Sequence, residues 1–311
     1  MTRRALGSLD VSLVGIGCNN FGARLDQVGT SAVVHAALDA GINFFDTADI
    51  YGNTESEVLL GVALRERRDE AVVATKFGMG TAGNGTEFSA RPDYIRFAIE
   101  ASLRRLNIAT IDLYQLHFPD DKTPLEDTLS TLAALRDEGK IREIGCSNFD
   151  GSMLRHAATL ASAGITFRSV QNQYSLLHRT PEQDDTLAAC ADLGVGFLPY
   201  YPLANGWLTG KFDPDAPLVE GTRLANMPAE RQGVWMSDEI RDRVRRLRAI
   251  SQETNIPLLT LAFSWLAAKP EVSSVIAGAS NPDQVRANAT AVVNLSAEIL
   301  RRLDDATASA A

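Results

Sequence analysis

The sequence lacks the features that mark several large classes of protein. It has no apolar run long enough to cross a membrane, so no membrane partner is expected. Its three cysteines, Cys18, Cys146 and Cys190, are an odd number at wide spacing, which favours reduced thiols over a disulfide framework. The first residues have neither an uninterrupted apolar core nor a small-residue cleavage site, so we predict a cytoplasmic protein without a secretory signal. No metal is predicted.

Positive charge is outnumbered by negative charge, with 30 Lys and Arg against 39 Asp and Glu. The formal net charge is -9 and the sequence pI is about 5.0, which opposes binding to nucleic acid because that affinity depends on neutralising phosphates. An arginine-rich stretch at residues 240–250 is the exception, but Ile240, Val244, Leu247 and Ile250 recur there at helical spacing. These arginines are therefore expected on the solvated face of a helix, and no nucleic-acid partner is predicted.

Two common nucleotide-binding motifs are missing. A Rossmann fingerprint would need a third glycine after Gly15 and Gly17, and Asn20 stands there instead. A P-loop would need four residues between its glycines, and only three separate those of the segment GWLTGK. The departures from these two motifs disfavour an open doubly wound sheet and a P-loop fold.

The sequence does contain a regular alternation of strand-like and helix-like segments. No linker or low-complexity tract separates parts of the sequence, so we predict a single domain over residues 1–311. Short β-branched or apolar runs alternate with amphipathic stretches, which is typical of a parallel sheet with helical crossovers. Eight runs are predicted as strands, at residues 12–17, 43–48, 71–77, 112–117, 141–148, 169–174, 194–200 and 272–278.

Eight strands and 311 residues predict an α/β fold, the (β/α)8 TIM barrel. Helices are expected between the strands, among them residues 30–41, 92–106 and 125–140. Residues 3–12 alternate about a turn and predict an N-terminal β-hairpin that plugs one end of the barrel. The stretch from Tyr201 to about Trp235 has no clear period and predicts a long loop after the seventh strand, acting as a lid or binding loop.

Polar side chains of different chemistry stand where three successive strands end. Asp46 ends the second strand with Tyr51 five residues later, Lys76 ends the third and His117 ends the fourth. The carboxyl ends of barrel strands meet at one face, so these residues are expected to lie together. A lysine ammonium stabilises a nearby phenolate and an aspartate anchors the lysine, which predicts a general-acid site for a carbonyl, with His117 orienting the substrate oxygen. Taken singly, each residue also has a structural explanation in packing or a solvated strand end.

Segments in unbroken order over nearly the whole chain closely resemble the aldo-keto reductase superfamily, to which the potassium-channel β subunits also belong. These segments are GINFFDTADIYGNTESEVLLG, VVATKFG, IDLYQLHFPD, IREIGCSNF, SVQNQYSLL, PYYPLANGWLTGK and IAGASNPDQVRAN. The resemblance implies a (β/α)8 barrel that binds NADPH in extended form. It places the catalytic tetrad on Asp46, Tyr51, Lys76 and His117.

The resemblance also implies which residues hold the cofactor. Ser147, Asn148 and Gln171 would hold the nicotinamide carboxamide, and Tyr200 would stack on the ring. The residues that would wrap the pyrophosphate are Tyr201, Leu203, Asn205, Gly206, Gly210 and Lys211. Those expected at the adenosine end are Gly278, Ser280, Gln284 and Asn288. Without the resemblance, Ser147 and Asn148 are turn residues, Gln171 is an inward polar residue of the barrel, and Lys211 is a surface cation.

The adenosine end also bears on the choice between NADPH and NADH. Asn281 and Pro282 predict a helix start whose amides can receive a phosphate. Strongly NADP-selective members of the family place Arg or Lys on this segment, whereas Arg286 is the only cation nearby here. NADPH is the predicted cofactor, with NADH as the alternative.

We predict NADPH-dependent reduction of an aldehyde or ketone to an alcohol by hydride transfer, with Tyr51 as general acid. The alternative is an NADPH-binding, redox-sensing regulatory subunit with slow turnover; net oxidation of an alcohol and the oligomeric state stay open. The residues predicted to form the mouth of an apolar, aromatic-edged substrate pocket are Asn20, Phe21, Phe118, and Trp207 or Trp235. Only a short tail follows the last predicted helix, so we expect an open site for a small aldehyde, a small ketone or a keto-sugar.

Overall fold

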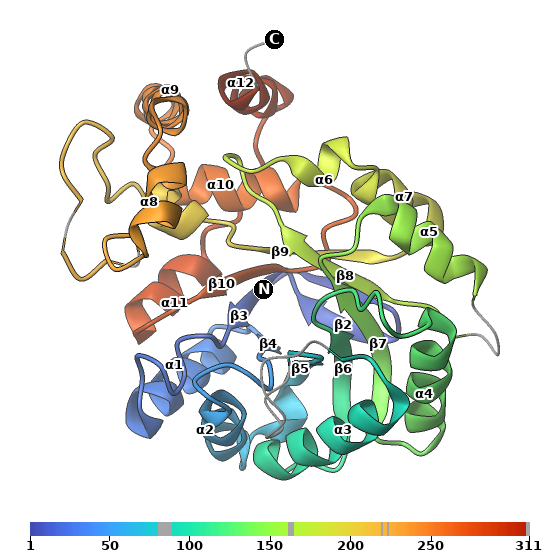
Figure 1. Ribbon diagram of the computed structural model, residues 1–311. Coiled ribbons are helices and arrows are strands. Elements are labelled where there is room, and N and C mark those ends of the chain that lie inside the picture. Colours follow the sequence, from blue (N-terminus) through green and yellow to red (C-terminus); the bar gives the residue numbers. More distant parts are fainter. Residues whose placement is uncertain (80–88, 161–164, 219, 223, 309–311) are drawn as a thin grey trace.

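Parallel strands wrap into a barrel in the computed structural model of this chain (Figure 1). The structure describes residues 1–79, 89–160, 165–218, 220–222 and 224–308. The barrel strands among these residues are β3 (Val14–Gly17), β4 (Phe44–Asp46), β5 (Val72–Phe77), β6 (Ile111–Leu116), β7 (Ile141–Ser147), β8 (Ser169–Gln173), β9 (Gly196–Tyr200) and β10 (Val275–Gly278). They pair in the order β10-β3-β4-β5-β6-β7-β8-β9, and a parallel bridge between Phe197 and Val272 brings β9 beside the start of β10. The predicted (β/α)8 barrel and its strands are confirmed.

Helices surround this barrel (Figure 1). Those described are α1 (Gln27–Asp39), α2 (Glu55–Leu64), α3 (Pro92–Leu106), α4 (Leu125–Asp137), α5 (Gly151–Thr159), α6 (Thr180–Gln183), α7 (Thr186–Leu193), α8 (Ala229–Trp235), α9 (Asp238–Thr254), α10 (Leu258–Ala267), α11 (Pro282–Ala289) and α12 (Ala297–Thr307), with short 3-10 turns η1 (Arg68–Glu70) and η2 (Ala204–Thr209). Helix α3 has the predicted bounds because Pro92 suits a first turn and Asn107 accepts the left-handed cap conformation. In the part of the chain that the structure describes, every helix is too short or too polar to span a membrane.

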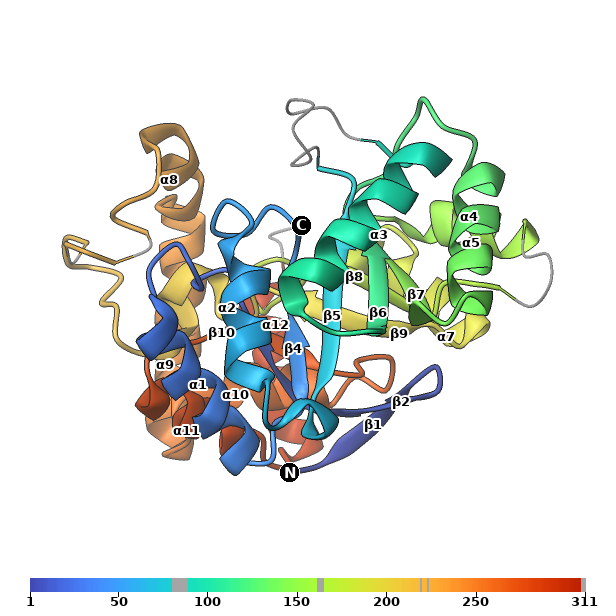
Figure 2. The same cartoon turned by 90° about the horizontal axis from the view of Figure 1, so that it is seen from below.

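The predicted N-terminal hairpin is confirmed as β1 (Arg3–Leu6) and β2 (Leu9–Ser12), and it covers the amino-terminal ends of the barrel strands. The Ser12 backbone N–H donates to Asn43 Oδ1 at 2.7 Å, just before β4. On the other side of the hairpin, the Arg4 guanidinium donates to the Ala267 and Val272 carbonyl oxygens. Figure 2 shows the hairpin at one end of the barrel and α8 at the other. The open end is therefore the one where the strands finish.

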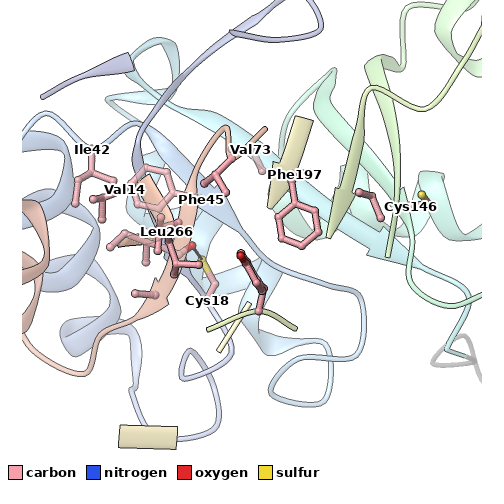
Figure 3. Packing of buried hydrophobic residues seen from close by; sticks show 14 of the residues in the cluster. Val14, Cys18, Ile42, Phe45, Val73, Cys146, Phe197 and Leu266 are labelled. Atoms are coloured by element: carbon pink, nitrogen blue, oxygen red, sulfur yellow. Dashed lines mark hydrogen bonds between the residues drawn. The ribbon is translucent and has the colours of Figure 1, made fainter. Parts of the chain in front are cut away.

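Neighbouring residues of each strand point alternately into the barrel and towards the helices. Phe45 and Val73 belong to the larger core between sheet and helices, part of which is drawn in Figure 3. Phe44 and Val72, one residue earlier, point into the barrel. The inward cluster also contains Leu6, Leu9, Val11, Ala74, Leu113, Leu198 and Ile276. Because three of these come from the hairpin, the lumen is apolar at its closed end.

The segment after β9 has more structure than a plain loop. It contains η2 and α8, so the prediction of an aperiodic stretch from Tyr201 to Trp235 is only partly right. Arginines of α9 hold its middle part: Arg241 and Arg248 donate to the Pro214 and Phe212 carbonyl oxygens, and Arg245 pairs with Asp215. The predicted solvated face is present, since Arg245 and Arg246 are exposed, and three arginines of this helix also bind the neighbouring segment.

Candidate active site

A polar layer lies above the apolar lumen, at the carboxyl ends of the strands. Asp46 is the last residue of β4, Lys76 lies near the end of β5, and His117 directly follows β6. The run Val72–Phe77 is buried throughout, which favours a central strand, and its alternation turns Lys76 to the same side as Val72 and Ala74. The side chain of Lys76 is 0% exposed, so the cation depends wholly on protein partners.

Lys76 has those partners. Its Nζ donates to Asp46 Oδ2 at 2.7 Å, to the Thr47 carbonyl oxygen at 2.8 Å and to Tyr51 Oη at 3.4 Å. An ammonium has three N–H donors, and each has an acceptor here. Burial alone would lower the pKa of Lys76, but Asp46 and Tyr51 outweigh burial and the pKa is raised. The lysine therefore stays charged beside the phenol.

Tyr51 has a raised pKa. Burial is the main cause, the Lys76 ammonium acts in the opposite direction, and Asp46 adds to the increase. We expected the cation to make this phenol more acidic overall. The contribution of Lys76 has the expected sign, but the cost of burying a phenolate exceeds it. The tyrosine is therefore a protonated donor at neutral pH.

His117 lies beside the phenol. Its ring stands edge-on to that of Tyr51, with centroids 6.0 Å apart, and stacks on Phe118 at 5.3 Å. Burial and the nearby Lys76 charge lower the pKa of His117 to about 3. The imidazole is therefore neutral, and its Nδ1 has no hydrogen-bond partner within the described residues. A neutral imidazole next to a protonated phenol suits the binding of a carbonyl oxygen.

The other carboxylate oxygen of Asp46 is held from inside the barrel. Gln171 Nε2 donates to Asp46 Oδ1 at 2.8 Å, and Gln115 Nε2 donates to the same atom at 3.1 Å. Sequence reasoning missed Gln115. The signal was available in the strand period, because Gln115 stands two residues before His117 and so faces the same side of β6.

The residues predicted to hold a nicotinamide carboxamide are brought together. Asn148 Nδ2 donates to the His117 carbonyl oxygen at 3.0 Å and to Ser147 Oγ at 3.1 Å. Ser147 Oγ donates to the Gln171 carbonyl oxygen at 2.7 Å, and Tyr200 Oη donates to Asn148 Oδ1 at 3.0 Å. Asn148 has a left-handed backbone, with φ at 61°, which asparagine tolerates better than most residues. This amide network joins the ends of β6, β7, β8 and β9.

The predicted pyrophosphate residues follow β9 on a contorted backbone. Tyr201, Asn205, Gly206 and Gly210 all have positive φ, with values of 53°, 57°, 110° and 78°. Tyr201 is 39% exposed and stands edge-on to Tyr200, Leu203 is partly buried, and Lys211 is exposed. A positive φ costs conformational energy in a residue other than glycine, and such residues are frequent where the backbone is shaped to bind a ligand.

The predicted adenosine end is a capped helix. Asn281 Oδ1 accepts from the Gln284 N–H at 3.0 Å, and Pro282 begins α11 as predicted. The Gln284 side chain accepts in turn from the Ser280 N–H at 2.8 Å, Gly278 is exposed at the end of β10, and Asn288 is buried. Arg286 pairs with Asp283 at 2.7 Å, so this cation already has a carboxylate partner.

The predicted pocket-mouth residues separate into two groups. Phe118 stacks on His117 and Trp235 is partly buried. Asn20 is buried at 7% exposure, and its Nδ2 donates to the Ala279 carbonyl oxygen at 3.1 Å. Phe21 and Trp207 lie inside the hydrophobic core instead, and Trp207 is 1% exposed. Large aromatic side chains gain most from complete burial, which explains why these two do not line an open mouth in this structure.

Comparison with known proteins identifies the relatives of this arrangement. The model of the aldo/keto reductase family matches residues 13–308. A putative voltage-gated potassium channel subunit beta of Schizosaccharomyces pombe is 34% identical over 90% of this chain and 84% of its own length. A probable voltage-gated potassium channel subunit beta of Oryza sativa subsp. japonica is 31% identical over 88% of this chain and 84% of its own length.

Solved structures agree with this result. A holo-form aldo-keto reductase of Bacillus halodurans superposes with a TM-score of 0.82 at 32% identity, covering 100% of this chain and 97% of that one. A glycerol dehydrogenase of Gluconobacter oxydans gives a TM-score of 0.84 at 29% identity, with coverage of 98% and 94%. The chain therefore belongs to the aldo/keto reductase family, whose members are oxidoreductases that act on carbonyl groups.

Proposed function

We propose that this protein reduces an aldehyde or ketone to an alcohol with NADPH, and that Tyr51 is the general acid. The observation that carries this proposal is the position of Lys76, whose buried ammonium lies between Asp46 Oδ2 at 2.7 Å and Tyr51 Oη at 3.4 Å. As a carbonyl is reduced, negative charge grows on its oxygen. The phenol gives its proton to that oxygen, and the adjacent ammonium stabilises the phenolate that remains.

The other residues of the site prepare this proton transfer. The neutral His117 ring can donate to the substrate oxygen without competing for the proton that Tyr51 supplies. Asp46 keeps Lys76 charged and fixed, because the pair shares a buried contact. The stacked ring of Phe118 covers His117 from one side and offers an apolar surface to the substrate.

The residues present fit a nicotinamide cofactor. The amide and hydroxyl groups of Asn148, Ser147 and Gln171 have the donors and acceptors that a carboxamide requires, and Tyr200 supplies an adjacent aromatic face. When bound, such a cofactor supplies a hydride to the carbonyl carbon. The exposed Lys211 can meet the pyrophosphate that NADPH and NADH share. Support for NADPH over NADH comes from the α11 start, where N–H groups can meet a phosphate.

The test combines cofactor binding with one turnover. Fluorescence titration with NADPH and with NADH measures affinity, and reduction of 4-nitrobenzaldehyde in the same sample measures chemistry. We expect Tyr51→Phe to bind NADPH normally and to lose reduction by about 100-fold or more. Tyr114→Phe is the matched control, because the Tyr114 hydroxyl is buried on β6 without a hydrogen-bond partner in the described structure. Full activity in Tyr51→Phe would contradict the proposal.

A regulatory subunit is the second candidate function. It is favoured by the two relatives whose names describe potassium channel β subunits. Such a protein would bind NADPH tightly and oxidise it slowly when a reactive aldehyde is present. A single-turnover rate slower than NADPH release would support this candidate, and a faster rate would support the reductase.

A further inference from the structure

Gln115 is a buried polar residue with only one of its two polar atoms in a hydrogen bond. Its side chain is 0% exposed and lies on β6, paired in register with Lys76 of β5 and Gly145 of β7. Its Oε1 has no hydrogen-bond partner among the described residues. A buried acceptor without a donor costs free energy, which a methionine or leucine of similar size would avoid. What Gln115 contributes is therefore its other end, the amide N–H group.

The contact of that amide has a fixed direction. A carboxylate only accepts hydrogen bonds, so Gln115 must turn Nε2 towards Asp46 Oδ1, and the two atoms lie 3.1 Å apart. Gln171 donates to the same oxygen at 2.8 Å from β8. With two donors on Oδ1, the carboxylate is held so that Oδ2 meets Lys76 at 2.7 Å.

This arrangement limits how strongly Asp46 attracts the ammonium. Lys76 is shared between Asp46 and Tyr51, and the contact to Tyr51 is the longer one at 3.4 Å. When Gln115 is removed, Gln171 alone holds Oδ1, and the carboxylate can rotate about that single contact until both of its oxygens meet Nζ. The ammonium would then move towards Asp46 and away from the phenol.

We propose that Gln115 is a positioning residue that holds Asp46 Oδ1 and thereby keeps the Lys76 ammonium available to Tyr51. The proposal rests on the function proposed above, in which Tyr51 is the proton donor. Gln115 itself touches none of the reacting atoms and acts through Asp46 and Lys76. The titratable groups around the Tyr51 phenol in the described structure are Lys76, Asp46, His117, Tyr200 and Tyr201.

The first test uses Gln115→Met in the cofactor-free full-length protein. Tyrosine labelled with 13C at Cζ reports ionisation by NMR, and Tyr51→Phe identifies the signal of Tyr51. We expect Tyr51 to ionise at a pH about one unit higher in Gln115→Met, because the ammonium has moved away. We also expect kcat for 4-nitrobenzaldehyde to fall about tenfold while NADPH affinity stays within twofold. The Tm should stay close to that of the wild type, because losing the hydrogen bond to Asp46 and losing the unpaired acceptor have opposite effects on stability.

Ser169→Ala is the matched control. Ser169 is buried on β8, its Oγ also lacks a partner in the described part of the chain, and the donors to Asp46 Oδ1 are Gln115 and Gln171 instead. Its removal should leave the Tyr51 titration and kcat unchanged. A purely structural role for buried glutamine would instead lower the Tm of Gln115→Met and leave the Tyr51 titration in place.

Gln115→Glu gives an independent readout and replaces Gln115→Met if that variant does not fold. The introduced carboxyl repels Asp46 when ionised, but donates to Oδ1 when protonated. Activity relative to wild type should therefore recover as the pH falls. A wild-type titration of Tyr51 in Gln115→Met, or the absence of recovery in Gln115→Glu, would overturn the proposal. If the wild-type protein reduces no carbonyl, the proposed function fails, and the NMR titration still decides the role of Gln115.

Discussion

Gln171 and Asp46 meet across the lumen of the barrel, with Gln171 Nε2 donating to Asp46 Oδ1 at 2.8 Å. They stand on β8 and β4, which are separated by three strands in the sheet. One residue was expected to hold the cofactor and the other to hold the catalytic lysine. Their contact joins the predicted cofactor-binding residues to the residues around Lys76. A substitution in either set should therefore affect the other.

Lys76→Met should be costly for both stability and activity. It leaves the Asp46 carboxylate buried without its cation, and breaking a buried pair in this way costs about 3–5 kcal/mol. Urea unfolding at neutral pH measures this loss. The double variant Asp46→Asn with Lys76→Met should regain much of the stability and none of the activity. Equal stability of the single and double variants would contradict the buried-pair explanation.

His117 should make the folded state less stable as the pH falls. Its pKa is lowered to about 3 in the folded state, against about 6.5 for an unperturbed histidine. Between these values the unfolded chain binds the proton and the folded protein does not, so stability is complete above about pH 6.5 and declines towards pH 3. The slope from one such group is at most about 1.4 kcal/mol per pH unit.

The measurement for His117 is the unfolding free energy at pH 7, 6 and 5, compared with His117→Gln. Other groups titrate in the same range, and the comparison removes their shared contribution. The variant should lose less stability on acidification than the wild type. Parallel curves for the two proteins would show that His117 is not protonated on unfolding.

Two glycines inside helices should respond oppositely to alanine. A Cβ on Gly61 of α2 would lie 2.3 Å from the Leu106 carbonyl oxygen at the end of α3, whereas a Cβ on Gly233 of α8 would meet nothing within 4 Å. Gly61→Ala should therefore destabilise the protein by about 1–3 kcal/mol through a backbone clash. Gly233→Ala should stabilise α8 by up to about 1 kcal/mol, because alanine is the better helix former. Thermal unfolding of both variants checks the signs, and a stabilised Gly61→Ala would refute the close approach of α2 and α3.

Two substitutions of Asn148 should distinguish the effect of its backbone conformation from the effect of its side-chain amide. Its φ of 61° suits glycine, so Asn148→Gly keeps the turn and loses the amide contacts to Tyr200 and His117. Asn148→Ala also loses the amide contacts, and it places a Cβ on a left-handed backbone. Its free energy of unfolding should therefore be about 1–2 kcal/mol lower than that of Asn148→Gly, because of backbone strain. If the amide holds the cofactor, both variants weaken NADPH binding to a similar extent. Wild-type affinity in Asn148→Gly would argue against the proposed carboxamide contact.

The barrel and its polar face were predictable because they depend on local sequence. Buried runs such as Val72–Phe77 fix a strand, and the position of Lys76 in that run fixes the face on which it lies. The burial of side chains such as Trp207 could not be predicted, because an aromatic residue in an aperiodic segment has no periodicity that distinguishes a pocket position from a core position. Helical spacing correctly predicted the outward face of α9, on which Arg245 and Arg246 are exposed, but it does not predict which segment such arginines bind.

The second limit on prediction from sequence is the relative size of opposing effects on a pKa. Lys76 beside Tyr51 was expected to acidify the phenol, but burial outweighs the cation and raises the pKa. Residue types give the sign of each effect, and only the depth of the site decides their sum. Gln115 was overlooked because it lies inside its strand, whereas the residues considered for catalysis were those at strand ends. Its place on β6 nevertheless puts it next to Asp46.

The pairing of β3 with β10 has a consequence for synthesis of this protein on the ribosome. These strands are the first and last of the barrel, with Val14 opposite Val275. Until the residues of β10 emerge, β3 presents an unpaired edge that another chain can pair with. The polar layer also stays open to water, because the barrel around it is incomplete. We therefore expect nascent chains truncated before β10 to be prone to aggregation, and the final strand to commit the chain to its native form.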